Sequence, residues 1–177
     1  NGRLPISIER KLEDNPTWGS YYHNLDVKVR NNPYKRVNYK EGLFLGYRGY
    51  DRKEVKPLFP FGYGLSYTTF KYSNLNVVDN GETVDVSFVL KNTGKYDGDE
   101  VAQVYVRLPE YEGKAPIKVL KGFKRVFLKK GESKTVTIPV RREDLRYWSE
   151  EKECFVILEG LPKVFVGASS EDIRLEK

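Results

Sequence analysis

Few residues in this chain have the chemistry of a nucleophile or a metal ligand. His23 is the single histidine and Cys154 the single cysteine, so the chain cannot supply the ligand set of a zinc site. A serine nucleophile needs a base beside it, and Ser66 lies in Gly-Leu-Ser-Tyr-Thr, which is not a nucleophile-elbow pattern. We therefore interpret His23 as a loop residue and Cys154, which lies in an apolar run, as an inert core residue.

Two carboxylates, Glu41 and Asp51, lie in an aromatic-rich stretch and suggest a second kind of chemistry. Paired carboxyl groups act as acid, base or nucleophile in the hydrolysis of glycosidic bonds. The alternative is structural, with Asp51 pairing with Arg48 or Arg52 to hold a turn. We favour the structural interpretation, and no catalytic residue is predicted in this chain.

Two short motifs have weak ligand-binding character. Gly62-Tyr63-Gly64 resembles a phosphate loop, but no Lys-Ser/Thr pair follows it and no parallel-sheet pattern surrounds it. The run Asp97–Glu100 holds carboxylates without the fixed offsets of a calcium loop, so we interpret it as a solvated turn. Neither a metal nor a cofactor is predicted.

Basic residues give the chain a net charge of +6, and many of them cluster between residues 114 and 134. The members of this cluster are Lys114, Lys118, Lys121, Lys124, Arg125, Lys129, Lys130 and Lys134. A polyanion or membrane surface would attract such a cluster. However, strand alternation distributes the lysines over solvent-exposed faces and edges, and acidic residues follow at 143–153. We expect neither a nucleic-acid partner nor a membrane, since no run approaches membrane-spanning length.

An aromatic stretch between residues 41 and 70 is interrupted by glycines and prolines and predicts an ordered joint. Large apolar residues occupy the odd positions from 59 to 67, with small or turn-forming residues between them. This period of two suits an extended segment that lies on another surface. The residues expected to pack between domains are Phe59, Phe61, Tyr63, Tyr67 and Phe70. Residues 13–40 show no period and are expected to form a loop or a tail over a neighbouring domain.

Short strands separated by turn signals fill the chain from Phe70 onward. The expected strands are 70–78, 83–91, 100–108, 117–128 (with a break at Gly122), 135–140, 153–159 and 163–168. Asp79-Asn80-Gly81 predicts a hairpin turn, and 142–148 could hold a short helical turn. A further short strand is expected at 4–8. About seven strands at this spacing predict an all-β, immunoglobulin-like sandwich.

The chain resembles the C-terminal part of glycoside hydrolase family 3, the β-glucosidase type. The motifs that carry the resemblance are Gly2–Ile6, EGLFLGYRGYD at 41–51, PLFPFGYGLSYTTF at 57–70, Leu120–Arg125 and Val166–Ser170. The resemblance implies that residues 1–68 are the tail of an α/β catalytic domain with an interdomain joint. It also implies that residues 69–177 form a fibronectin type III-like domain.

The resemblance further implies a parent enzyme that removes terminal β-linked sugars with retention, a β-glucosidase or a β-xylosidase. Its two catalytic carboxylates belong to regions whose motifs do not occur in this chain. The expected partners are the upstream barrel and α/β domains, and the expected substrate is an oligosaccharide or aryl β-glycoside. The absence of methionine also predicts a piece of a longer protein. A periplasmic or secreted location is slightly favoured over a cytoplasmic one.

The alternative is a free-standing carbohydrate- or protein-binding sandwich. In that case exposed aromatic residues such as Trp18, Tyr21 and Tyr22 would stack on sugar rings. The length of the open reading frame upstream separates the two possibilities.

Overall fold

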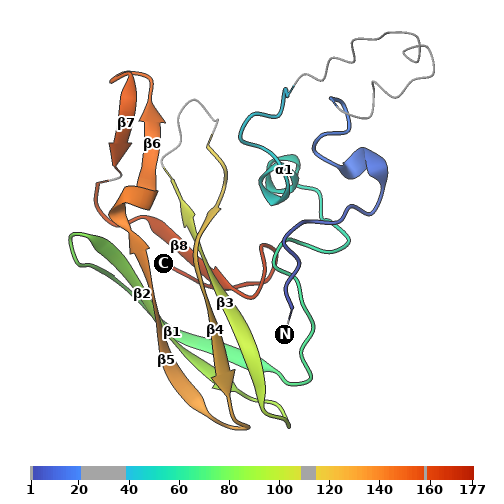
Figure 1. Cartoon of the computed structure of the whole chain (residues 1–177), viewed down its shortest axis with the longest axis vertical. Coiled ribbons are helices and arrows are strands. Elements are labelled where there is room, and N and C mark those ends of the chain that lie inside the picture. The colour runs from blue at the N-terminus through green and yellow to red at the C-terminus, as the bar shows by residue number, and fades with distance from the viewer. Residues whose placement is uncertain (1, 21–38, 109–114, 158) are drawn as a thin grey trace.

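The fold consists of an irregular N-terminal segment followed by a two-sheet β-sandwich (Figure 1). The structure is a computed structural model and describes residues 2–20, 39–108, 115–157 and 159–177. We use "N-terminal segment" for residues 2–20 and 39–69. The elements of that segment are the 3₁₀-helix η1 (Leu12–Asp14) and the helix α1 (Tyr47–Lys53).

The sandwich begins at Phe70 and contains nine strands within the described residues. They are β1 (Phe70–Asp79), β2 (Thr83–Asn92), β3 (Gly98–Arg107), β4 (Val119–Leu128), β5 (Ser133–Arg141), β6 (Arg146–Ser149), β7 (Cys154–Ile157), β8 (Lys163–Gly167) and β9 (Ile173–Glu176). A 3₁₀-helix, η4 (Arg142–Leu145), links β5 to β6. One sheet has the order β1-β2-β5, and the other has the order β4-β3-β8-β9.

The core lies between these two sheets because alternate residues of the strands place apolar side chains on the inner faces of both sheets. In β2, alternate residues from Val84 to Leu90 are fully buried, and β5 pairs antiparallel with β2 through Val136, Ile138 and Val140. From the facing sheet, Val104 and Val166 enter the same cluster. Each fully buried side chain of this kind contributes about 2 kcal/mol before entropy is counted. The predicted all-β sandwich is confirmed.

Several expected elements differ from those in the structure. The expected strand at 4–8 is wrong, because only Ile8 forms a bridge there, with Phe59. Strand β4 continues through Gly122 without ending, but a register shift lies at the expected position, because Val104 pairs with Gly122 and Tyr105 pairs with Leu120. The expected hairpin after Asp79 is confirmed by the antiparallel β1–β2 pairing. Strand β9 was not expected.

Strands β6 and β7 form a separate two-stranded ribbon that projects beyond the two sheets (Figure 1). Cys154 lies at the start of β7 and is exposed. The expectation of a core cysteine is therefore wrong, because the strand that carries it is not part of the main sheets. The helical turn expected at 142–148 is present as η4 and is followed by β6.

The N-terminal segment lies beside the sheet that contains β3 and is connected to the sandwich through Thr68 and Thr69. The Thr68 hydroxyl donates to the buried Asn92 side chain at 2.7 Å, and Thr93 N–H donates to Thr69 C=O at 2.8 Å. Among the residues that the structure describes, no helix is both long and apolar enough to cross a bilayer.

Candidate functional site: the junction between the N-terminal segment and the sandwich

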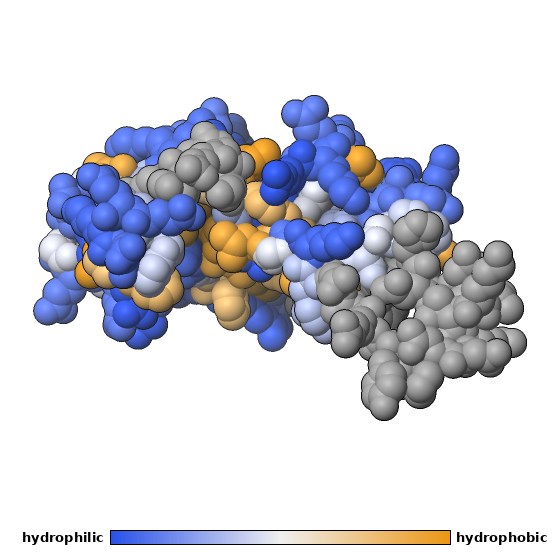
Figure 2. Space-filling view, turned by 90° about the horizontal axis from the view of Figure 1, so that it is seen from above, coloured by the Kyte–Doolittle hydropathy of each residue, from blue (hydrophilic) through white to orange (hydrophobic). Residues whose placement is uncertain are grey.

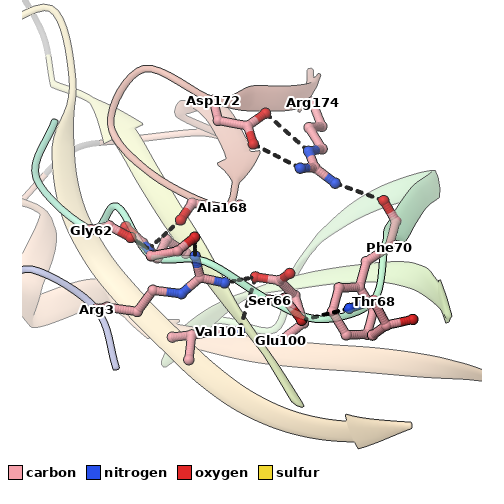
Figure 3. A network of polar contacts seen from close by, with 12 residues as sticks. Arg3, Gly62, Ser66, Thr68, Phe70, Glu100, Val101, Ala168, Asp172 and Arg174 are labelled. Atoms are coloured by element: carbon pink, nitrogen blue, oxygen red, sulfur yellow. Dashed lines mark hydrogen bonds and ion pairs between the residues drawn. The ribbon is translucent and has the colours of Figure 1, made fainter. Parts of the chain in front are cut away.

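A buried ion pair joins the start of the chain to β3 (Figure 3). The Arg3 guanidinium contacts the Glu100 carboxylate and also donates to Gly64 C=O at 3.0 Å. The two charged side chains are only 13% and 4% exposed. Burial raises the pKa of the Glu100 carboxyl, and the positive charge of Arg3 opposes that rise. Arg3 therefore neutralises a carboxylate that the sandwich places out of water.

A glutamine on β3 makes the second connection across the junction. The Gln103 side-chain amide donates to Gly62 C=O at 3.2 Å and to Ala168 C=O at 2.7 Å, and its oxygen accepts from the Tyr105 hydroxyl at 2.6 Å. Gly62 has a φ of 80°, so its close approach to the amide suits a residue without Cβ. Ser170 N–H also donates to Phe61 C=O at 2.9 Å. Nearly all of the hydrogen-bonding capacity of Gln103 is used.

The third connection is a salt bridge between helix α1 and Lys118, the residue that precedes β4. Lys118 Nζ lies 2.7 Å from Asp51 Oδ1, and the two side chains are 10% and 5% exposed. The expectation that Asp51 pairs with Arg48 or Arg52 is therefore wrong, as is the expectation that Lys118 is solvated. A lysine 67 residues away is the closer partner because α1 packs against this end of the sheet. Tyr47, on the same helix, accepts a hydrogen bond from Leu120 N–H at 3.0 Å.

The stability of the chain is expected to depend on pH through Asp51. Burial raises the pKa of this carboxyl above its ordinary value of 3.8, although Lys118 lowers it. Above pH 3.8 the folded state therefore holds a proton more tightly than the unfolded chain, and a rise in pH through this window favours unfolding. We expect the wild type to lose stability relative to Asp51→Asn as the pH rises, as measured by urea unfolding at successive pH values.

The comparison with Asp51→Asn is needed because other carboxyl groups make the folded state more stable as the pH rises, which is opposite to the effect of Asp51. Asp79 and Asp144 accept hydrogen bonds from Gly81 N–H and Arg141 respectively, and these bonds lower their pKa values. If the wild type gained stability relative to the variant with rising pH, burial would not dominate the pKa of Asp51.

The five aromatic residues expected to pack between domains occupy different environments. Phe70 is buried in the sandwich core. Phe61 is half-buried, with its ring centroid 5.0 Å from that of Tyr47, and Phe59 lies 5.2 Å from Tyr63. Tyr67 is 92% exposed. Packing of these residues against a further domain remains a prediction.

The N-terminal segment carries many exposed apolar side chains. They are Ile6, Leu12, Tyr39, Leu43, Leu45, Leu58, Phe59, Leu65 and Tyr67. Seen from above, the molecule shows hydrophobic residues gathered in the middle of the face, with hydrophilic residues on either side (Figure 2). Apolar exposure of this extent in one segment is typical of a surface that contacts another protein region.

The other residues that the sequence marked as chemically capable do not come together in one site within the described residues. Asp97 accepts from Lys130 N–H at 2.7 Å, and Asp99 pairs with Arg125 at 2.8 Å, so the carboxylates of this turn have separate partners. Glu41 lines a cavity of about 480 Å³ beside α1. Within the described ranges, no group of three or more His, Cys, Asp or Glu residues is arranged to hold a metal ion. His23, Tyr21 and Tyr22 lie outside the described residues.

Comparisons with known proteins show which proteins have a similar sequence and fold. Residues 100–170 match the fibronectin type III-like domain family. The chain is 39% identical over 181 residues to the thermostable beta-glucosidase B of Acetivibrio thermocellus, covering 100% of this chain and 23% of that protein. It is 39% identical over 180 residues to a Bacteroides ovatus protein, the beta-glucosidase BoGH3A, covering 98% of this chain and 23% of that protein.

Solved structures show the same relation. The beta-glucosidase 3B of Thermotoga neapolitana, in complex with α-D-glucose, superposes with a TM-score of 0.85 at 39% identity, covering 100% of this chain and 24% of that one. The GH3 beta-glucosidase of Bifidobacterium adolescentis gives 0.84 at 35% identity, covering 99% of this chain and 25% of that one. The chain thus spans about a quarter of the length of these relatives, in which the matching region is part of a longer chain.

Proposed function

Because this chain belongs to glycoside hydrolase family 3 as a C-terminal part of a β-glucosidase-type protein, we propose that it braces the catalytic domains of a retaining, exo-acting β-glucosidase. Its substrate class would be oligosaccharides or aryl glycosides with a terminal β-linked glucose. The observation that carries this proposal is the exposed apolar surface of the N-terminal segment, which is itself fixed to the sandwich. We place the boundary between the joint and the fibronectin type III-like domain at residues 68 and 69.

The proposed chemistry requires two carboxyl groups that this chain does not contribute. In a retaining glycosidase one carboxylate attacks the anomeric carbon, and the other protonates the leaving oxygen and then activates water. The carboxylates of the junction have other tasks, since Glu100 and Asp51 are buried against Arg3 and Lys118. The contribution of this chain is to hold the upstream domains in position, which preserves the geometry of the reacting groups.

The 177-residue chain is expected to show no turnover of 4-nitrophenyl β-D-glucoside, whereas the full-length protein is expected to release β-glucose first. The measurement is nitrophenol release, together with proton NMR of the anomeric product. If the 177-residue chain hydrolysed the glucoside and Asp51→Asn abolished that activity, the assignment of the catalytic groups to upstream domains would be wrong. An inactive full-length protein, or one that first released α-glucose, would contradict the proposed reaction.

A further inference from the structure

The β6–β7 ribbon carries an aromatic pair that the junction does not use. Trp148 and Phe155 lie directly opposite each other in the ribbon register, with ring centroids 5.3 Å apart and an interplanar angle of 79°. They remain 50% and 66% exposed. Ile157, two residues further along β7, lies on the same side of the ribbon and is also exposed.

Polar groups surround a hollow next to this pair. A cavity of about 310 Å³ is lined by Glu143, Asp144, Arg146 and Phe155. Asp144 accepts two hydrogen bonds from Arg141, at 2.9 and 3.0 Å, and the Arg146 guanidinium lies 3.7 Å from the Glu143 carboxylate. Carboxylate oxygens accept hydrogen bonds and a guanidinium donates them. The hollow therefore combines an aromatic wall with acceptors and a donor at its rim.

The local charge limits which ligands this hollow can attract. Residues 142–159 contain six acidic and three basic residues, although the whole chain has a net charge of +6. An acidic surface repels nucleic acids, phosphorylated ligands and anionic membranes. A protein partner would need about 800 Å² of buried surface on each side, and the exposed apolar face of the ribbon consists of three side chains. A small neutral ligand with one apolar face and a polar rim fits these conditions.

Pyranose rings have that form, since their axial C–H bonds present an apolar face and their hydroxyl groups form a polar edge. We propose that the β6–β7 ribbon binds a neutral oligosaccharide, with a sugar ring against Trp148 or Phe155 and its hydroxyl groups toward Glu143 and Arg146. This inference goes beyond the bracing role and does not depend on it. The ribbon would hold polymeric or oligomeric sugar near the enzyme without taking part in hydrolysis.

Tryptophan fluorescence gives a direct test, because the chain contains two tryptophans, Trp18 and Trp148. In a Trp18→Phe variant of the 177-residue chain, Trp148 becomes the only reporter. The probes are cellohexaose, laminarihexaose and maltohexaose. We expect saturable quenching or enhancement by at least one of them, with a Kd of about 1 mM.

Phe155→Ala in the same background is expected to weaken that binding about tenfold, as truncation of a central aromatic contact does. The matched control is Phe123→Ala, which removes an exposed aromatic residue from β4 and should leave the affinity unchanged. Unchanged melting temperatures of both variants would show that they remain folded.

Two outcomes would overturn the proposal. The first is that none of the three sugars changes the fluorescence at concentrations about ten times the expected Kd. The second is that a sugar binds but Phe155→Ala has no effect. If the chain self-associates and Phe155→Ala abolishes this while no sugar binds, the ribbon is a contact between copies of the chain. None of these results depends on turnover, so they are independent of the test of the proposed function.

Discussion

Replacing Arg3 with alanine is expected to lower the free energy of unfolding of the 177-residue chain by about 3 kcal/mol, the low end of the cost of breaking a buried ion pair. The substitution leaves the Glu100 carboxylate buried without the guanidinium that neutralises it. Gly64 C=O also loses its donor. The measurement is urea unfolding followed by circular dichroism at neutral pH.

The partner variant separates the loss of the ion pair from a general loss of packing. Glu100→Gln removes the buried charge, so the Arg3→Ala/Glu100→Gln double variant should be more stable than Arg3→Ala alone. Arg125→Ala, which removes the cation of the exposed Asp99 pair, should change the unfolding midpoint little. If Arg3→Ala behaved like Arg125→Ala, the start of the chain would not be fixed to β3 in the way described.

Replacing Gly62 with alanine is expected to destabilise the chain by at least about 3 kcal/mol, because it combines backbone strain with steric overlap in the junction. A Cβ atom at this position would lie 2.6 Å from the Gln103 amide nitrogen and closer still to its oxygen. Gln103 cannot move away without losing its hydrogen bonds to Ala168 and Tyr105. Thermal and urea unfolding of the variant measure the effect.

Gly81→Ala provides a matched control for the backbone part of this cost. Gly81 has a φ of 81°, almost the same as that of Gly62, but a Cβ atom there would meet nothing within 4 Å. It should therefore cost only about 1 kcal/mol, which is the penalty of the left-handed conformation alone. Equal losses in the two variants would show that the contact between Gly62 and Gln103 is loose.

The sandwich was predictable from the sequence because its signals are local. Most residues of β2 show in their own type which side of the sheet they face, so the alternate residues Val84, Val86, Phe88 and Leu90 could be placed in the core directly. Asp79-Asn80-Gly81 likewise indicates its turn without reference to the rest of the chain. Strand β9 was missed because it is four residues long and half charged.

The junction was less predictable because its contacts connect residues far apart in the sequence. Arg3 and Glu100 are separated by 97 positions, and Asp51 and Lys118 by 67. No sequence periodicity marks such a pair. In the sequence, Arg48 and Arg52 are much nearer to Asp51 than Lys118 is, so they were the expected partners. Helix α1 was missed for a different reason, because its local signals are weak. It is seven residues long, contains Gly49 and lacks a side-chain cap.

The period-two pattern from 59 to 67 predicts one extended segment, and the structure differs from that prediction. Within the described residues, Phe61 lies beside Tyr47 of α1, whereas packing of this pattern against a further domain remains a prediction. Gly62 adopts a positive φ, however, so the segment does not continue as one extended run with a single apolar face. Leu65 and Tyr67 are exposed, at 78% and 92%.

The bracing role is tested most directly by replacing Leu65 and Tyr67, two strongly exposed apolar residues of the N-terminal segment. The double variant Leu65→Ser/Tyr67→Ser is compared with Phe123→Ser, in both the 177-residue chain and the full-length protein. The two readouts are melting temperature and kcat/KM for 4-nitrophenyl β-D-glucoside.

In the 177-residue chain neither variant should lower the melting temperature appreciably, since all three side chains are exposed. In the full-length protein we expect the double variant alone to lower the melting temperature by at least about 3 °C and to reduce kcat/KM. If the full-length double variant kept the melting temperature and turnover of the wild type, the N-terminal segment would not brace the catalytic domains.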